Sequence, residues 1–148
     1  MRGMFSNCKS LKELNLSSFN TDKVTYMDSM FRNCESLKKI NLSSFNTRNC
    51  KQMIKMFQNC KSLKDLNLSS FSTNKVNLMN MMFSGCLSLK NLNISNFNVS
   101  MVENMNYMFE HCYSLKKLNL DNFNTKNCTE MRGIVIYFFY DKFVMKYL

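Results

Sequence analysis

The chain has no proline and no tryptophan, and its 148 residues include only three glycines and one histidine. Proline and glycine are the residues that tight turns use most often, so a fold that depends on many such turns is disfavoured. Asparagine, serine, threonine and aspartate are abundant and are therefore expected to turn the chain. The sequence also lacks a run of about 18 apolar residues, so it predicts no transmembrane helix and no membrane insertion by this segment.

Methionine, phenylalanine and cysteine are plentiful, with 14, 13 and 7 copies, and the net charge is +10. Residues 1–26, 27–52 and 53–78 carry +2, +3 and +3, whereas residues 79–104 and 105–130 are each neutral. A basic half of this kind attracts anionic partners such as nucleic acid, an acidic protein or anionic glycans. Surplus lysine is, however, more often simply a solvated surface, so the charge alone does not identify a function.

The dominant feature is a repeat of 26 residues, which covers residues 1–130 without one insertion or deletion. We call the residues at equivalent positions of successive repeats a column. Met-Phe pairs begin at Met4, Met30, Met56, Met82 and Met108. The cysteine column is Cys8, Cys34, Cys60, Cys86 and Cys112. Further columns are occupied by leucine, phenylalanine and methionine, and this regularity predicts five copies of one structural unit.

Two apolar spacings alternate within each repeat. Leu14 and Leu16 lie two residues apart, which predicts a short strand with both side chains on one face. Strands are expected at residues 13–17, 39–43, 65–69, 91–95 and 117–121, all in one parallel sheet. The residues from Val24 to Cys34 have spacings of three and four, which predicts a helix near 22–34 with Thr21 or Asp22 as its N-cap. The expected fold is α/β, a right-handed leucine-rich-repeat solenoid of about five 26-residue repeats, with one parallel sheet on one face and helices on the other.

The chain is expected to divide into a five-repeat solenoid, residues 1–130, and a divergent apolar C-terminal tail or cap, residues 131–148. Asp141 falls where a core leucine belongs, so the tail is not a sixth repeat. Met1-Arg2-Gly3 aligns with Met131-Arg132-Gly133, so the first repeat begins inside an expected helix. A solenoid needs polar terminal repeats to cover its core. Neighbouring repeats of a longer parent chain are therefore expected.

The residues favour no enzymatic chemistry. Carboxylates form no column, His111 has no paired nucleophile and is interpreted as a turn residue, and no phosphate loop is present. A zinc site is disfavoured because no Cys-x-x-Cys pair exists. Disulfides between neighbouring repeats and buried free thiols both remain open, and Cys50 and Cys128, which replace valine in their column, favour buried thiols. We therefore predict a protein that is not an enzyme and that needs no metal or cofactor.

Polar columns next to the predicted strands are the candidate binding residues. Asparagine, serine and lysine recur there, and stacked asparagine amides can bond to one another or to a ligand. The candidate ligand-binding residues are Lys12, Asn15, Ser17, Lys38, Asn41, Ser43, Lys64, Asn67 and Ser69. Five lysines in one column repel one another mildly, so they favour a use in binding, although duplication of the repeat also explains them. The sheet face is accordingly predicted to be polar and basic.

The consensus of the repeat is Met-Phe-x-x-Cys-x-Ser-Leu-Lys-x-Leu-Asn-Leu-Ser-Ser-Phe-Asn-Thr-x-x-Val-x-x-Met. This consensus resembles the repeat of the BspA-like leucine-rich-repeat surface proteins, which include mycoplasma lipoproteins. The resemblance covers residues 1–130 and implies a cell-surface or extracellular location with an adhesive role. It implies no particular binding residues. No export signal follows Met1, and the pattern ends after Ile134.

The function that we predict is a non-enzymatic surface module for binding or adhesion, with a protein or glycan partner. An intracellular leucine-rich-repeat scaffold for protein–protein interaction is the alternative. Nucleic-acid binding is disfavoured because ten of the 13 phenylalanines lie in two core columns, which leaves few aromatic side chains to stack on bases.

Overall fold

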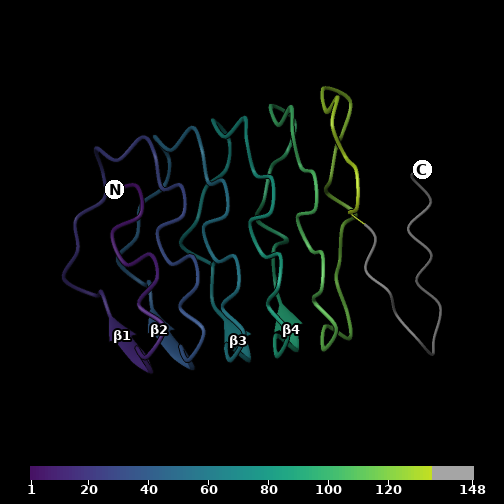
Figure 1. Cartoon of the computed structure of the whole chain (residues 1–148). Coiled ribbons are helices and arrows are strands. Elements are labelled where there is room, and N and C mark those ends of the chain that lie inside the picture. Colours follow the sequence, from purple (N-terminus) through teal and green to yellow (C-terminus); the bar gives the residue numbers. More distant parts are fainter. Residues whose placement is uncertain (135–148) are drawn as a thin grey trace.

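The computed structural model describes residues 1–134 of the chain. Within these residues the regular elements are four short strands: β1 (Glu13–Asn15), β2 (Lys39–Asn41), β3 (Asp65–Leu66) and β4 (Asn91–Leu92). Equivalent residues pair in parallel one repeat apart, as Glu13 does with Lys39 and Asp65 with Asn91. Each repeat therefore makes one circuit and stacks on the previous one, which brings all four strands to the same edge of the molecule (Figure 1).

The expected helices are absent, so the prediction of an α/β leucine-rich-repeat solenoid with helices on one face is wrong. Among residues 1–134 no segment is helical; residues 22–34 and their equivalents run instead through successive turns. Single parallel bridges join these segments in place of helix packing. The bridges are Tyr26 to Gln52, Gln52 to Leu78, Leu78 to Asn104 and Asn104 to Glu130. We call this row of bridges the second ladder.

The backbone hydrogen bonds explain why apolar spacings of three and four do not form a helix here. The amide of Ser29 donates to the Ile54 carbonyl at 2.8 Å, and that of Phe31 to the Met56 carbonyl at 2.9 Å. Between them, the Met30 amide donates to the Met27 carbonyl, three residues back, at 3.3 Å. In a helix every amide would bond four residues back along its own segment. Here alternate amides bond to the next repeat, and this arrangement keeps the same side chains on the inner face.

Two residues in each repeat adopt the left-handed backbone conformation, which a right-handed helix does not contain. One column is Gly3, Ser29, Lys55, Met81, Tyr107 and Gly133, and the other is Asn7, Asn33, Asn59, Gly85 and His111. The non-glycine members have φ between 55° and 64°. The asparagines and His111 occupy turns as expected. Lys55, Met81 and Tyr107 do so as well, and these residue types were not expected to turn the chain.

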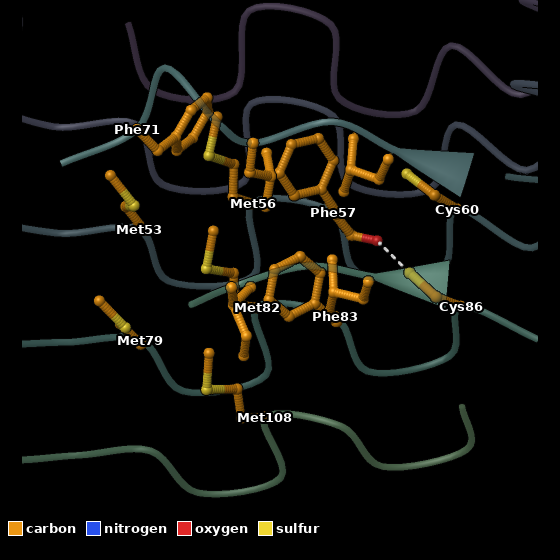
Figure 2. Packing of buried hydrophobic residues seen from close by; sticks show 14 of the residues in the cluster. Met53, Met56, Phe57, Cys60, Phe71, Met79, Met82, Phe83, Cys86 and Met108 are labelled. Carbon is orange, nitrogen blue, oxygen red and sulfur yellow. Dashed lines mark hydrogen bonds between the residues drawn. The ribbon is translucent and has the colours of Figure 1, made fainter. Parts of the chain in front are cut away.

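The core consists of columns of methionine, phenylalanine, leucine and cysteine that continue from repeat to repeat (Figure 2). Phe57 has an exposed fraction of 0% and lies between Phe31 and Phe83, with ring centroids 5.3 Å and 5.8 Å away. The rings of Phe57 and Phe83 are nearly parallel, 1° apart. Identical side chains one repeat apart therefore stack on each other, so the interior is an ordered set of rows.

The strands form two pairs and not one sheet of five. β1 pairs with β2 and β3 with β4, and no ladder joins β2 to β3 in the described chain. The predicted fifth strand is reduced to one bridge between Asn91 and Lys117. The orientation of the side chains agrees with the expected alternation, since Leu16 is buried and Asn15 is exposed.

The predicted tail, residues 131–148, lies mostly outside the described residues. Of the segment 134–148 only Ile134 is described, and its side chain is buried against the core of the stack. In residues 1–134 no helix is long and apolar enough to cross a membrane.

Candidate functional site

All nine predicted binding residues are exposed and lie on or beside the strands. We call the surface formed by the columns that begin at Lys12, Glu13, Asn15 and Ser17 the strand face. The backbone amide of Lys38 donates to the Lys12 carbonyl at 2.8 Å, which places these two lysines in neighbouring repeats. The structure therefore brings the predicted residues to one surface, as their spacing of 26 residues requires.

The asparagines of the column that begins at Asn15 lie at the end of each strand or directly after it. The Oδ1 atom of Asn15 accepts a hydrogen bond from the Ser17 amide at 3.1 Å, and the same bond recurs in the four later repeats. An asparagine that bonds to the backbone two residues ahead forms an Asx turn. The expected row of amides bonded to one another is absent from the described chain.

The Asx turns decide what the asparagines can offer to a ligand. Because Oδ1 is occupied by a backbone amide, Nδ2 with its two N–H groups is left as the outward group. No described residue accepts a hydrogen bond from the Nδ2 atom of any asparagine in this column. The strand face therefore carries a row of amide donors, spaced about 4.8 Å apart where neighbouring strands pair.

The residues next to the Asx turns join neighbouring repeats. The Ser44 hydroxyl donates to the Leu16 carbonyl at 2.9 Å, and the Ser70 hydroxyl to the Leu42 carbonyl at 3.1 Å. In the fourth repeat Asn96 Nδ2 donates to two carbonyls of the third. These side chains hold the asparagine row in place, which a binding surface needs if it is not to lose order on contact with a ligand.

The electrostatics of the strand face are dominated by lysine. Seven exposed lysines and two exposed carboxylates occupy the columns that begin at Lys12 and Glu13. Of these carboxylates, Glu13 forms an ion pair with Lys39 at 3.2 Å. Asp65 accepts a hydrogen bond from Asn91 at 3.2 Å and has no ion pair within the described residues. The face combines many cationic and neutral N–H donors with few carboxylates, beside serine hydroxyls that both donate and accept.

A hollow of about 440 Å³ opens in the strand face where β2 and β3 fail to pair. Its lining residues are Lys38, Lys39, Ile40, Asp65, Leu66, Asn67, Asn91 and Asn93. Two of these, Lys38 and Asn67, belong to the predicted binding set. The other polar lining residues were not among the predicted binding residues, although their columns alternate with the core leucines and so face outward. They are Lys39, Asp65, Asn91 and Asn93.

The repeats remain joined on both sides of the hollow. The Ser62 amide donates to the Glu35 carbonyl at 3.1 Å before the strands, and the Ser70 hydroxyl binds the Leu42 carbonyl after them. The gap is therefore local to the strands and is not a separation of the two repeats.

Threonine forms a buried column, and the prediction that Thr21 caps a helix is wrong. Thr47 is 1% exposed; its Oγ1 donates to the Ser72 carbonyl at 2.8 Å and accepts from the Ser72 amide at 2.7 Å. Thr21 and Thr73 do the same with the repeats that follow them. Val99 occupies this column in the fourth repeat, and that replacement was a sequence signal of a buried position.

The cysteines are free thiols within the described residues, and five of the seven are buried. Cys60 Sγ donates to the Phe31 carbonyl at 3.2 Å. Cys86 Sγ donates to the Phe57 carbonyl at the same distance (Figure 2). Burial raises the pKa of Cys34 and Cys50 to about 11. The buried thiols are therefore packing residues. Those of the cysteine column also satisfy a carbonyl of the preceding repeat, whereas Cys50 donates to the Gln52 carbonyl of its own repeat. In residues 1–134 no three histidine, cysteine or acidic side chains gather as a possible metal site.

A thiol reagent at about pH 8 should label Cys8 rapidly and Cys128 more slowly, because only these two thiols are exposed or partly exposed. The five buried thiols should be protected, since the reactive thiolate is both inaccessible and disfavoured by the raised pKa. After denaturation without reductant all seven should react. Mass spectrometry of the labelled peptides measures this, and fewer than seven labels in the denatured protein would show disulfides instead.

The family model described as "Mycoplasma protein of unknown function, DUF285" matches residues 1–91 and, in a second overlapping match, residues 63–140. Comparison with curated proteins and with solved structures gave no match. The two matches to the family model together span most of the chain. The chain therefore belongs to this Mycoplasma family, DUF285.

Proposed function

We propose that the protein is a non-enzymatic binding module of the cell surface, which uses the strand face to hold an anionic protein or glycan partner. The observation that supports this most directly is the combination of exposed lysines with asparagines whose Nδ2 groups point away from their Asx turns. A surface with many N–H donors and few carboxylates suits a partner rich in carboxylate, sulfate or carbonyl oxygens.

The surface location is supported by the sequence resemblance to BspA-like surface proteins. The leucine-rich-repeat fold that this resemblance implied is not part of the proposal, because the helices are absent. The strand face is also suited to binding by its construction, since hydrogen bonds between repeats fix its asparagines before a ligand arrives.

Charge reversal tests this proposal. The variant carries Lys12→Glu, Lys38→Glu and Lys64→Glu, and the probes are immobilised heparin and immobilised poly-L-glutamate. Each exposed lysine contributes up to ~1 kcal/mol, so binding should weaken roughly tenfold or more. The dependence of binding on salt should also become flatter, because fewer cations face the ligand. Surface plasmon resonance at several salt concentrations measures both effects.

A matched control has the same change in net charge elsewhere on the molecule. It carries Lys23→Glu, Lys51→Glu and Lys75→Glu, three exposed lysines in the segments that lead to the second ladder. This control should retain most of its binding. If the control lost as much binding as the strand-face variant, or more, the proposed binding surface would be wrong.

A further inference from the structure

The hollow between β2 and β3 differs from the rest of the strand face in its chemistry. Its lining combines N–H donors with a carboxylate and an amide oxygen. Asp65 supplies a carboxylate, and Asn91, whose Nδ2 donates to Asp65, leaves its Oδ1 without a partner in the described chain. Asn67 and Asn93 supply Nδ2 donors, because their Oδ1 atoms accept the amides of residues 69 and 95.

The two walls of the hollow carry opposite charge. Lys38 and Lys39 lie on the β2 side, and Asp65 lies on the β3 side. The amine of Lys39 is held by Glu13 at 3.2 Å, whereas Lys38 has no ion pair among residues 1–134. Ile40 and Leu66 add apolar atoms between the walls. A ligand that fits must therefore bring an anionic group for Lys38, hydroxyls for the amides and Asp65, and a small apolar surface.

These requirements favour a sugar over a protein side chain. A sugar hydroxyl donates and accepts at once, so it can bond to a carboxylate and to an amide N–H in the same place. Protein–protein hot spots are usually built from tryptophan, tyrosine and arginine in a pocket. None of these residue types lines the hollow.

We infer that the hollow between β2 and β3 binds one sugar unit that carries a carboxylate or a sulfate, as part of an acidic glycan. Lys38 binds the anionic substituent, Asn67 and Asn93 donate to sugar oxygens, and Asp65 accepts from a sugar hydroxyl. This inference rests on the proposed function of the strand face and names its ligand class. The hollow extends from β2 across β3 to Asn91 and Asn93, so the sugar contacts three neighbouring repeats.

The test uses the full chain and two charged disaccharides, one with a uronic acid and one with a sulfate, together with a neutral disaccharide. Asn67→Asp is the informative variant, because the aspartate still accepts the amide of residue 69 and so keeps the Asx turn. It replaces the Nδ2 donor with an anionic oxygen. Asn98→Asp is the matched control, since it makes the same change at an Asx turn, with the Ser100 amide, outside both the hollow and the strand face.

We expect at least one charged disaccharide to bind, and the neutral one to bind at least tenfold more weakly. Asn67→Asp should weaken binding at least tenfold, and Asn98→Asp less than twofold, as measured by calorimetry. Shifts in the NMR amide signals of residues 66–69 and 91–94 should mark the site, and circular dichroism should show both variants folded. Comparison of the affinities for the uronic acid disaccharide and the sulfated disaccharide identifies which anionic group Lys38 binds.

Several results would overturn this inference and leave the proposed function standing. One is equal weakening by the two variants, which would show that binding depends only on the overall charge of the protein. Another is the absence of disaccharide binding while the wild type still binds heparin through the lysines of the strand face. A third is tighter binding of an acidic peptide than of either charged disaccharide in the hollow. If the strand-face lysine variant and its lysine control lost binding equally, the proposed function itself would be wrong.

Discussion

Replacing Phe57 with alanine should lower the free energy of unfolding by about 3–5 kcal/mol, the usual cost of removing a fully buried ring. Phe57 is 0% exposed and has a phenylalanine ring on each side, at 5.3 Å and 5.8 Å. The alanine would leave a cavity between two rings that the stacked repeats hold apart, so the site has little freedom to collapse. Urea denaturation followed by circular dichroism measures the loss.

Phe5 provides the control for this prediction. It belongs to the same column, but it is partly exposed, and within its column it stacks on one ring alone, that of Phe31 at 5.7 Å. Phe5→Ala should therefore cost less than half as much as Phe57→Ala. Equal losses at the two positions would contradict the view that stacking on both sides determines the stability of the row.

Thr47→Val should destabilise the protein by about 2–4 kcal/mol, although valine has nearly the same shape. The Thr47 hydroxyl is the partner of both the carbonyl and the amide of Ser72. Valine would leave two buried backbone groups without hydrogen bonds, at ~1–3 kcal/mol for each. The same denaturation experiment measures this, and hydrogen exchange at the Ser72 amide should become faster.

Thr47→Ser distinguishes the contribution of the hydroxyl to stability from that of the methyl group. Serine keeps both hydrogen bonds and loses one buried methyl, so its cost should stay near ~1 kcal/mol. If serine were as damaging as valine, packing of the methyl group and not the double hydrogen bond would explain why threonine recurs in this column.

The sequence was sufficient to predict the repeat register, the core columns and the outward position of the asparagines. These depend on which side chains are apolar and on the constant spacing of 26 residues, and both are visible in one sequence. Leu16 is buried and Asn15 exposed for this reason. The positions of the candidate site residues on one face follow from the same two facts.

The helices were predicted wrongly because apolar spacing reports which side chains face the core and not where the amides bond. A run of turns with a left-handed residue at Ser29 gives the same inner face as a helix. Gly3 and Gly133 stand in the column of Ser29, in the middle of the expected helix, and they were the available warning. Nothing in the sequence indicated the hollow. It lies where β2 and β3 do not pair, although their two repeats have similar sequences.

The pairing of each repeat with the next has a consequence for how this protein can change in length. Every bridge and every row of side chains joins residues about 26 positions apart. Loss or gain of a whole repeat leaves all later rows aligned, whereas loss of one residue moves each later side chain out of its row. Gain or loss of a full repeat therefore preserves the rows of the interior, whereas an insertion or deletion of any other length disrupts them.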